Sequence, residues 1–173
     1  MEYQNKKFDL EKFKGINFTG KSFKDSRFTE CIFDNCNLSN VNLENTKLQD
    51  VVFKDSKVLG LNFARCKKIM FKLNFENSFI SMSAFTGLDL RDTSFTNCKV
   101  YECDFAEANL TNANFEHSDL KESRFQGTNL TLASFKNAKN YEIDPNLNKI
   151  KKAKFSIPEV VSLLRPFDLD LDN

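Results

Sequence analysis

Few side chains in this sequence are suited to metal binding, redox chemistry or proton transfer. Those whose type or spacing suggests such chemistry are five cysteines, one histidine and a short run of alternating aspartates near the end of the chain. Cys31 and Cys36 share the spacing C-x4-C with Cys98 and Cys103. Paired thiols at short spacing can hold a metal ion or form a disulfide, so this pattern must be weighed against the element that carries it.

The histidine and the aspartates carry weaker signals. His117 has no partner arranged around it by spacing. Asp168, Asp170 and Asp172 alternate as in a calcium-binding loop, but the glycine and the distal glutamate of such a loop are absent. A glycine-rich phosphate loop and a nucleophile motif are also missing. We therefore expect a protein that is not an enzyme and that has no metal site and no cofactor.

The element that carries these residues has a five-residue period. A large apolar residue occupies every fifth position, a spacing that neither a helix nor a strand keeps on one face. The first register is Phe8, Phe13, Phe18, Phe23, Phe28, Phe33, Leu38, Leu43, Leu48, Phe53, Val58 and Phe63. The second is Phe75, Ile80, Phe85, Leu90, Phe95, Val100, Phe105, Leu110, Phe115, Leu120, Phe125, Leu130 and Phe135. Because the two registers are offset by two residues, we expect a bulge or kink within 65–75.

A second residue, two positions before each large one, is nearly always small in the second register. The other three positions of each five are mostly polar. A backbone that turns a corner every five residues would point the large and the small residue inward and stack its turns about 4.8 Å apart. All five cysteines, including Cys66, fall on such inward positions, so we interpret them as buried fillers. His117 lies two positions after a large residue and should point outward.

This pattern resembles the pentapeptide-repeat family, whose motif is A(D/N)LXX. The motif stands here as Ala108-Asn109-Leu110, Ala113-Asn114-Phe115, Ser118-Asp119-Leu120 and Thr128-Asn129-Leu130. The resemblance covers roughly residues 6–139 and implies an all-β fold, a right-handed quadrilateral β-helix with four five-residue sides per coil. We divide the chain into this solenoid, 1–139, with a register offset near 65–75, and a C-terminal element, 140–173.

The C-terminal element should cover the open end of the solenoid. Ser156 and Glu159 fit a capping box, which predicts a short amphipathic helix over 157–164 that ends before Pro166. Alternation of apolar and acidic residues then predicts a half-exposed strand. Relatives in the family dimerise through such an element, so the resemblance implies a homodimer. The residues expected in the cap and dimer are Ile157, Val160, Val161, Leu164, Phe167, Leu169 and Leu171.

Composition narrows the setting in which the protein works. The chain has 173 residues and a formal net charge of +1. This balance does not favour direct nucleic-acid binding, and no apolar run approaches the length of a membrane span. Residues 1–7 lack a signal-peptide core. We expect a cytoplasmic protein whose cysteines remain thiols.

Two outward-facing groups are candidate contact surfaces. The first is an apolar group that could bind a partner, or whose phenylalanines could instead fold over the bulge and seal it. It comprises Leu59, Met70, Phe71, Phe79, Met82 and Tyr101. The second is an acidic group interrupted by basic residues, and it comprises Asp25, Glu44, Asp104 and Glu107.

The sequence is similar to quinolone-resistance and gyrase-interacting pentapeptide proteins. This similarity implies a DNA mimic that binds DNA gyrase or topoisomerase IV and modulates quinolone sensitivity. The alternative is a neutral scaffold for another protein partner. A continuous negative stripe would favour the mimic, and a mixed surface would favour the scaffold.

Overall fold

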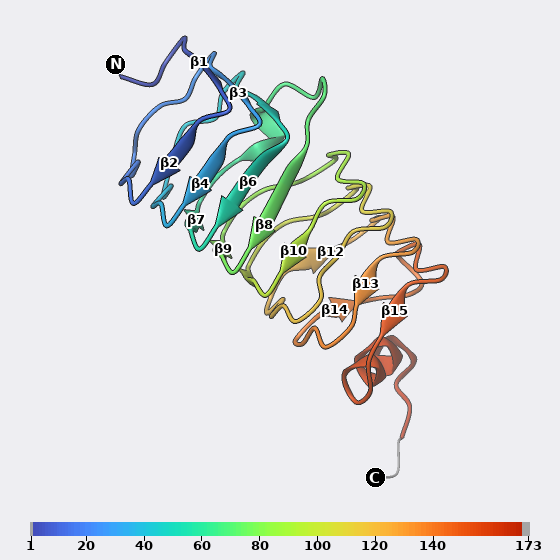
Figure 1. Ribbon diagram of the computed structural model, residues 1–173. Coiled ribbons are helices and arrows are strands. Elements are labelled where there is room, and N and C mark those ends of the chain that lie inside the picture. The colour runs from blue at the N-terminus through green and yellow to red at the C-terminus, as the bar shows by residue number, and fades with distance from the viewer. Residues whose placement is uncertain (1, 171–173) are drawn as a thin grey trace.

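The chain folds as a stack of short parallel strands. The computed structural model describes residues 2–170. Strands about one coil apart in the sequence pair side by side, so the chain forms a parallel, four-sided β-solenoid of about seven turns (Figure 1). The N-terminal coil and the C-terminal helix lie at opposite ends of this rod (Figure 1). The fold expected from the five-residue period is confirmed.

The sides follow one another around each coil in the order A, B, C, D. Side A carries β1 (Lys7–Asp9), β3 (Arg27–Thr29) and β5 (Lys47–Gln49). Side B carries β2 (Lys12–Lys14), β4 (Ile32–Asp34), β6 (Val51–Lys54), β8 (Leu73–Glu76), β10 (Phe95–Thr96), β13 (Ser134–Phe135) and β15 (Lys154–Phe155). Side C carries β7 (Lys57–Leu59), β9 (Phe79–Ser81) and β11 (Lys99–Tyr101). Side D carries β12 (Arg124–Phe125) and β14 (Glu142–Ile143).

Corners recur because every fifth residue has a left-handed backbone. Asn35, Asn40 and Asn45 have φ values of 52°, 55° and 57°. Asparagine, aspartate and glycine adopt this conformation at low cost, which explains their frequency at these positions. His117 occupies one such corner with φ 60° and is exposed. It therefore points outward, as expected.

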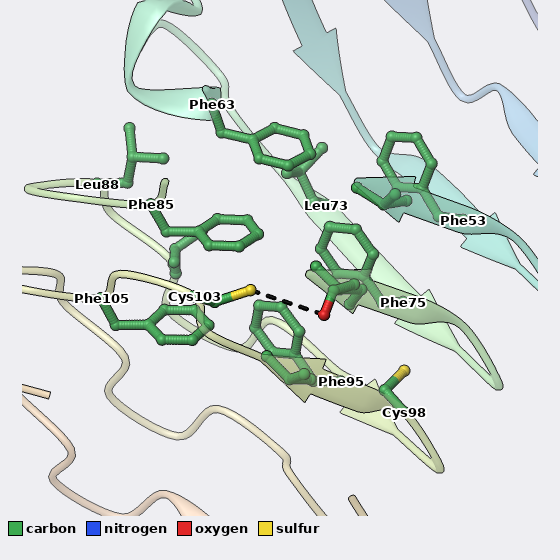
Figure 2. Close-up of a cluster of buried hydrophobic side chains, with 14 of the residues drawn as sticks. Phe53, Phe63, Leu73, Phe75, Phe85, Leu88, Phe95, Cys98, Cys103 and Phe105 are labelled. Carbon is green, nitrogen blue, oxygen red and sulfur yellow. Dashed lines mark hydrogen bonds between the residues drawn. The ribbon is translucent and has the colours of Figure 1, made fainter. Parts of the chain in front are cut away.

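Phenylalanine rings stack in columns along the core (Figure 2). On side B, the rings of Phe75, Phe95 and Phe115 lie with successive centroids 4.9 Å apart. Rings of neighbouring columns meet edge to face, as Phe75 and Phe85 do at 90°. Both arrangements are favourable for aromatic quadrupoles.

The small inward positions hold the coils together by hydrogen bonds. The hydroxyl of Thr46 donates to the carbonyl of Phe23 over 2.8 Å, and that of Ser123 donates to the carbonyl of Val100 over 2.7 Å. Each bond links a side chain to the preceding coil. Because these hydroxyls are buried, their pairing explains why serine and threonine are tolerated beside a phenylalanine core.

The register offset lies in a single coil. Phe53 pairs with Phe75, and Val58 pairs with Ile80, 22 residues apart, whereas Phe33 pairs with Phe53, 20 residues apart. The chain makes a 3₁₀ turn, η1 (Phe63–Arg65), and then crosses side A without a strand. The two extra residues therefore lie on side A, between η1 and β8.

Parallel pairing continues past the boundary expected at residue 139. Asp119 bridges to Lys139, β12 pairs with β14, and β13 pairs with β15. The sequence period ends earlier because side D of the last coil comes two residues early: Phe125 pairs with Ile143, 18 residues on. The loop after Ile143 then restores the spacing of 20 residues at Lys149. Phe155 still completes the side B column, with its ring 5.2 Å from that of Phe135. The segment beyond the solenoid therefore begins at Ser156.

The C-terminal helix differs from the prediction. It is a 3₁₀ helix, η2 (Glu159–Phe167), and it continues through Pro166. A proline near the end of a 3₁₀ segment removes a single bond, and the amide of Asp168 bonds beyond it to the carbonyl of Arg165. The expected strand is wrong for the described residues, because Phe167 belongs to η2 and residues 168–170 have no strand partner there. Leu171 lies outside the described residues.

The expected capping box is also wrong. No side chain caps the first turn of η2. Ser156 Oγ instead accepts the amide N–H of Asn137 over 3.0 Å, and Glu159 Oε1 accepts that of Asn140 over 2.8 Å. These side chains therefore satisfy the open edge of the last coil. None of the helices among residues 2–170 has the length and apolarity needed to cross a membrane.

Candidate functional site

Side C presents a row of apolar side chains on three consecutive coils. Leu59 and Tyr101 both pair in register with Ser81, so they lie on either side of this small residue. Phe79 lies on the same strand as Ser81, and Met82 follows it at the corner, 57% exposed. We call Leu59, Phe79, Met82 and Tyr101 the side C row. The structure brings these four sequence-predicted residues together.

The two aromatic rings of the row hold each other. Phe79 and Tyr101 meet edge to face, with centroids 5.8 Å apart and planes at 88°. The Tyr101 hydroxyl donates to Asp119 Oδ2 over 3.0 Å, and Asp119 also accepts from Asn140 Nδ2 over 2.7 Å. The Tyr101 side chain is therefore held by Phe79 at its ring and by Asp119 at its hydroxyl, while the aromatic pair remains partly exposed.

The environment of Tyr101 keeps it neutral. Desolvation raises the pKa of its phenol, and its hydrogen bond to the Asp119 carboxylate raises this pKa further. Sequence analysis named Asp119 within the repeat motif but did not predict its hydrogen bond to Tyr101. The spacing of 18 residues could have predicted this bond, because side chains 18 residues apart also bond on side D, where the Thr86 hydroxyl donates to the Asp104 carboxylate.

Two predicted members of the group lie elsewhere. Residues 67–72 stack on Thr46 and Leu48 of side A, and Met70 Sδ lies 3.9 Å from Lys47 Nζ. Side A is opposite side C in a four-sided coil. Met70 is 60% exposed, whereas Phe71 packs partly against the core. The expectation that Met70 and Phe71 join Phe79 is therefore wrong, because the extra residues fall on side A.

The acidic group does not form one run. Asp25 and Glu44 lie on adjacent coils of side D, where Glu44 pairs with Lys24 over 3.0 Å. Asp104 and Glu107 lie several coils further along the same side. The backbone of Asp104 pairs with that of Arg124 on the next coil, which places the two side chains on the same side, and the Asp104 carboxylate accepts from Thr86. The stretch between these pairs contains Arg65 and neutral residues, so positive and neutral groups interrupt the carboxylates.

The five cysteines are buried thiols. Burial raises the pKa of Cys66, Cys98 and Cys103 to about 12. Cys103 Sγ lies 3.8 Å from the carbonyl oxygen of Ile80, the position that a serine hydroxyl fills elsewhere. Within residues 2–170, no group of three or more His, Cys, Asp or Glu side chains is placed to hold a metal ion.

The predicted cap residues divide into two sets. Val160 packs partly against the core, and Leu163, which the prediction did not single out, is 9% exposed and anchors η2. The others are directed outward, with exposures of 86% for Ile157, 46% for Val161, 38% for Leu164, 49% for Phe167 and 54% for Leu169. A shallow groove between Val161, Leu164 and Leu169 runs along η2.

These surfaces can bind but have no reactive arrangement among the described residues. Tyrosine, phenylalanine and methionine are enriched at the centres of protein interfaces. Asp119, the carboxylate that bonds to the side C row, accepts hydrogen bonds from Tyr101 and Asn140. The row therefore offers apolar area with a fixed aromatic pair, which suits a protein partner.

Comparison with known families matches most of the chain. A family model described as the pentapeptide repeat region matches residues 6–74 and 26–102. A second, described as pentapeptide repeats (8 copies), matches residues 101–137. A search of the curated proteins found no match to this sequence.

Solved structures share the fold. Full-length QnrB1, described as a plasmid-mediated fluoroquinolone resistance protein, is 13% identical, and the match covers 96% of this chain and 92% of that chain with a TM-score of 0.61. A trypsin-treated variant of QnrB1 is 16% identical, with coverage of 98% of this chain and 92% of that chain and a TM-score of 0.53.

Proposed function

The chain belongs to the pentapeptide-repeat family, and we propose that it acts as a non-enzymatic rod that binds another protein. The side C row is the observation that carries this proposal. Its aromatic pair is held in place before binding, so little side-chain entropy is lost when a partner covers it. A contact centred on Phe79 and Tyr101 would resemble the buried aromatic anchors of known interfaces.

The partner we propose is DNA gyrase or topoisomerase IV. Support comes from the likeness in fold to QnrB1 over nearly the whole of both chains. In this proposal the protein modulates fluoroquinolone sensitivity and acts in the cytoplasm, where these enzymes work. The alternative partner is an unidentified protein that uses the same row.

The charge pattern favours a mixed contact over DNA mimicry. Duplex DNA presents closely spaced negative charges along its length. On side D, Asp25 and Glu44 are separated from Asp104 and Glu107 by Arg65 and neutral residues. We therefore propose that binding uses the apolar row, with the acidic group contributing to orientation only.

We also propose a homodimer through η2. Ile157, Val161 and Leu164 are exposed, and Val161 and Leu164 border a groove. Their burial would remove apolar area from water. Val160 and Leu163 hold η2 on the last coil, so the dimer contact would sit on a fixed support.

The test is a direct binding measurement. Full-length protein is immobilised, and purified gyrase and topoisomerase IV from its own host are passed over it in a biosensor. Saturable binding at micromolar concentration or below is expected from one of them. Absence of binding by both enzymes would remove the topoisomerases as partners and leave the unidentified protein.

A further inference from the structure

The two ends of the solenoid are finished differently. At the C-terminal end, η2 and the side chains of Ser156 and Glu159 cover the last coil. At the N-terminal end, the ring of Tyr3 crosses the first coil and lies 5.0 Å from Phe18, 5.8 Å from Phe23 and 6.3 Å from Phe8. These contacts reach sides A, C and D, whereas Phe13 of side B has no ring contact with Tyr3.

The open part is the free edge of β2. This strand is the terminal member of its sheet and pairs only with β4 among the described residues. Its sequence is Lys12-Phe13-Lys14, with both lysines exposed and Phe13 half-buried. Lys12 also pairs with Asp34 over 2.9 Å, but 56% of its side chain stays exposed. In the next coil, Phe33 is fully buried beneath Phe13, with ring centroids 4.9 Å apart, so Phe13 is the uncovered end of the side B column.

A segment at the other end of the chain has the matching pattern. The side chains of Asp168, Leu169 and Asp170 alternate in sequence as in a strand, yet these residues form no strand and all three are exposed. Asp168 ends η2 with a left-handed φ of 49°, so pairing as a strand requires its backbone to become extended. Leu169 is 54% exposed at the edge of the η2 groove. The alternation that predicts a strand thus has no strand partner among residues 2–170.

We propose that residues 168–170 of one molecule add as a strand to the β2 edge of a second molecule. Leu169 would cover Phe13, and the two aspartates would lie directly opposite Lys12 and Lys14. Strand addition to a free edge supplies main-chain hydrogen bonds, and alternate side chains set specificity. Because Asp-Leu-Asp reads the same in both directions, the charges match in a parallel or an antiparallel pairing.

The charges select β2 among the edges of the first coil. We call residues 168–170 the acidic tail. The neighbouring edge strand, β1, has the sequence Lys7-Phe8-Asp9, so one aspartate of the acidic tail would lie opposite Asp9. Like charges directly opposite destabilise a strand pair. Two β2 edges meeting each other would likewise oppose lysine to lysine. The occupant that fits is therefore the acidic tail.

The contact must join two molecules head to tail. Residues 168–170 leave η2 at the far end of the rod from β2, about seven coils or roughly 30 Å away at the spacing between parallel strands. A head-to-tail contact is heterologous and leaves a free edge and a free tail at the two ends, so it propagates into chains of molecules. It uses neither the side C row nor Ile157, Val161 and Leu164, so it does not depend on the proposed partner contact. Leu169 was expected in the dimer, and this inference assigns it to the head-to-tail contact instead.

Sedimentation velocity of the full chain with charge-reversed variants tests the proposal. One variant is K12E/K14E, and the other is D168K/D170K. In each variant alone, the β2 edge and residues 168–170 carry charge of the same sign, so association should weaken at least tenfold. A mixture restores opposite signs at both junctions and should recover association. K136E/K149E, which reverses two exposed lysines at the other end of the rod, is the matched control and should behave as the unmodified chain.

Circular dichroism of each variant shows whether it is folded. Two results together support the contact. Association of the unmodified chain falls with added salt, and mixing the two variants recovers the association that each lacks alone. Two outcomes overturn it: folded variants that associate like the unmodified chain, or a mixture that fails to recover. A labelled peptide of residues 166–173 identifies the site, because K12E/K14E should lose its binding. Peptide binding without association of the full chain would show that the edge accepts acidic segments of other proteins, which also overturns the proposal of a second copy.

Discussion

The ring of Phe79 meets that of Tyr101 edge to face at 5.8 Å on the surface of side C, and the Tyr101 hydroxyl is held by Asp119. Few aromatic rings in this protein contribute to the surface in this way, since most phenylalanines are fully buried in the stacked columns. A solenoid whose core already contains its aromatic residues has no packing need for this pair. We propose that the pair instead serves as a contact surface.

Replacing both rings with serine should weaken partner binding without unfolding the protein. The double variant F79S/Y101S removes a half-exposed pair, and an aromatic pair contributes about 0.5–1.5 kcal/mol beyond its buried area, so most of the fold's stability should remain. The dissociation constant for the partner should rise at least tenfold. The matched control is L132S, which removes an apolar residue that is 43% exposed on side A. Equal affinities of F79S/Y101S and L132S would show that side C is not the contact.

Truncating one ring in the middle of the side B column should cost much more than truncating one at its end. Phe95 is fully buried, with ring centroids of Phe75 and Phe115 each 4.9 Å away. Phe95→Ala should lower the free energy of unfolding by about 3–5 kcal/mol. Phe13→Ala should cost less than half as much, because Phe13 is only half-buried. Urea unfolding followed by circular dichroism measures both, and equal losses would contradict the column as the source of stability.

The acceptors on the last coil can be tested separately from the helix. S156A/E159A removes the Ser156 hydroxyl and the Glu159 carboxylate, which accept the amide N–H groups of Asn137 and Asn140. A single hydrogen bond contributes about 0.5–1.5 kcal/mol, so the loss should be small and local. Hydrogen exchange at the two amides should accelerate, while amides in the central coils keep their rates. Unchanged exchange at both positions would show that these side chains do not close the edge.

Stability should fall in alkaline solution because of the buried thiols. The pKa values of Cys98 and Cys103 are raised from 9.0 to about 12, so the unfolded state loses these protons at lower pH than the folded state. The stabilisation is fully present below about pH 9 and is lost as the pH rises towards 12. At pH 10.5 the loss should be roughly 2 kcal/mol per thiol.

The variant C98S/C103S provides the comparison. Serine occupies the same inward position in other coils and donates to a carbonyl of the preceding coil, as Ser123 does to Val100. Its hydroxyl does not ionise in this range. Urea unfolding at pH 8 and pH 10.5 should therefore show a smaller alkaline loss in the variant. An equal loss would assign the pH dependence to other groups, of which Tyr141, with its pKa raised to about 12 mainly by burial, is the first to test.

The five-residue period predicted the solenoid because a corner every five residues constrains the residue type at each position of the repeat. Large, small and left-handed positions each restrict the residue type, so the pattern is redundant. The two-residue offset was also visible, since Phe63 and Phe75 fall out of step. The side on which the extra residues lie was not visible. Met70 and Phe71 were therefore placed with Phe79, although they lie on side A.

Local signals failed at the C-terminus because tertiary contacts used the same residues. Ser156 and Glu159 have the spacing of a capping box, but the free amides of the last coil bind them instead. Alternation at Phe167 and Leu169 predicts a strand, yet a strand needs a neighbouring edge, and the chain has already left the solenoid on η2. The bond between Tyr101 and Asp119 was missed because it links neighbouring coils at a spacing of 18, which the period of five does not highlight.

The measurement that tests the central claim most directly is a gyrase supercoiling assay with and without a fluoroquinolone, using gyrase from the protein's own host. Purified full-length protein is titrated against F79S/Y101S and L132S. We predict that the unmodified protein and L132S change supercoiling or rescue it from the drug at micromolar concentration or below, and that F79S/Y101S needs at least tenfold more. No effect of the unmodified protein at large excess would contradict the proposal that this rod binds gyrase.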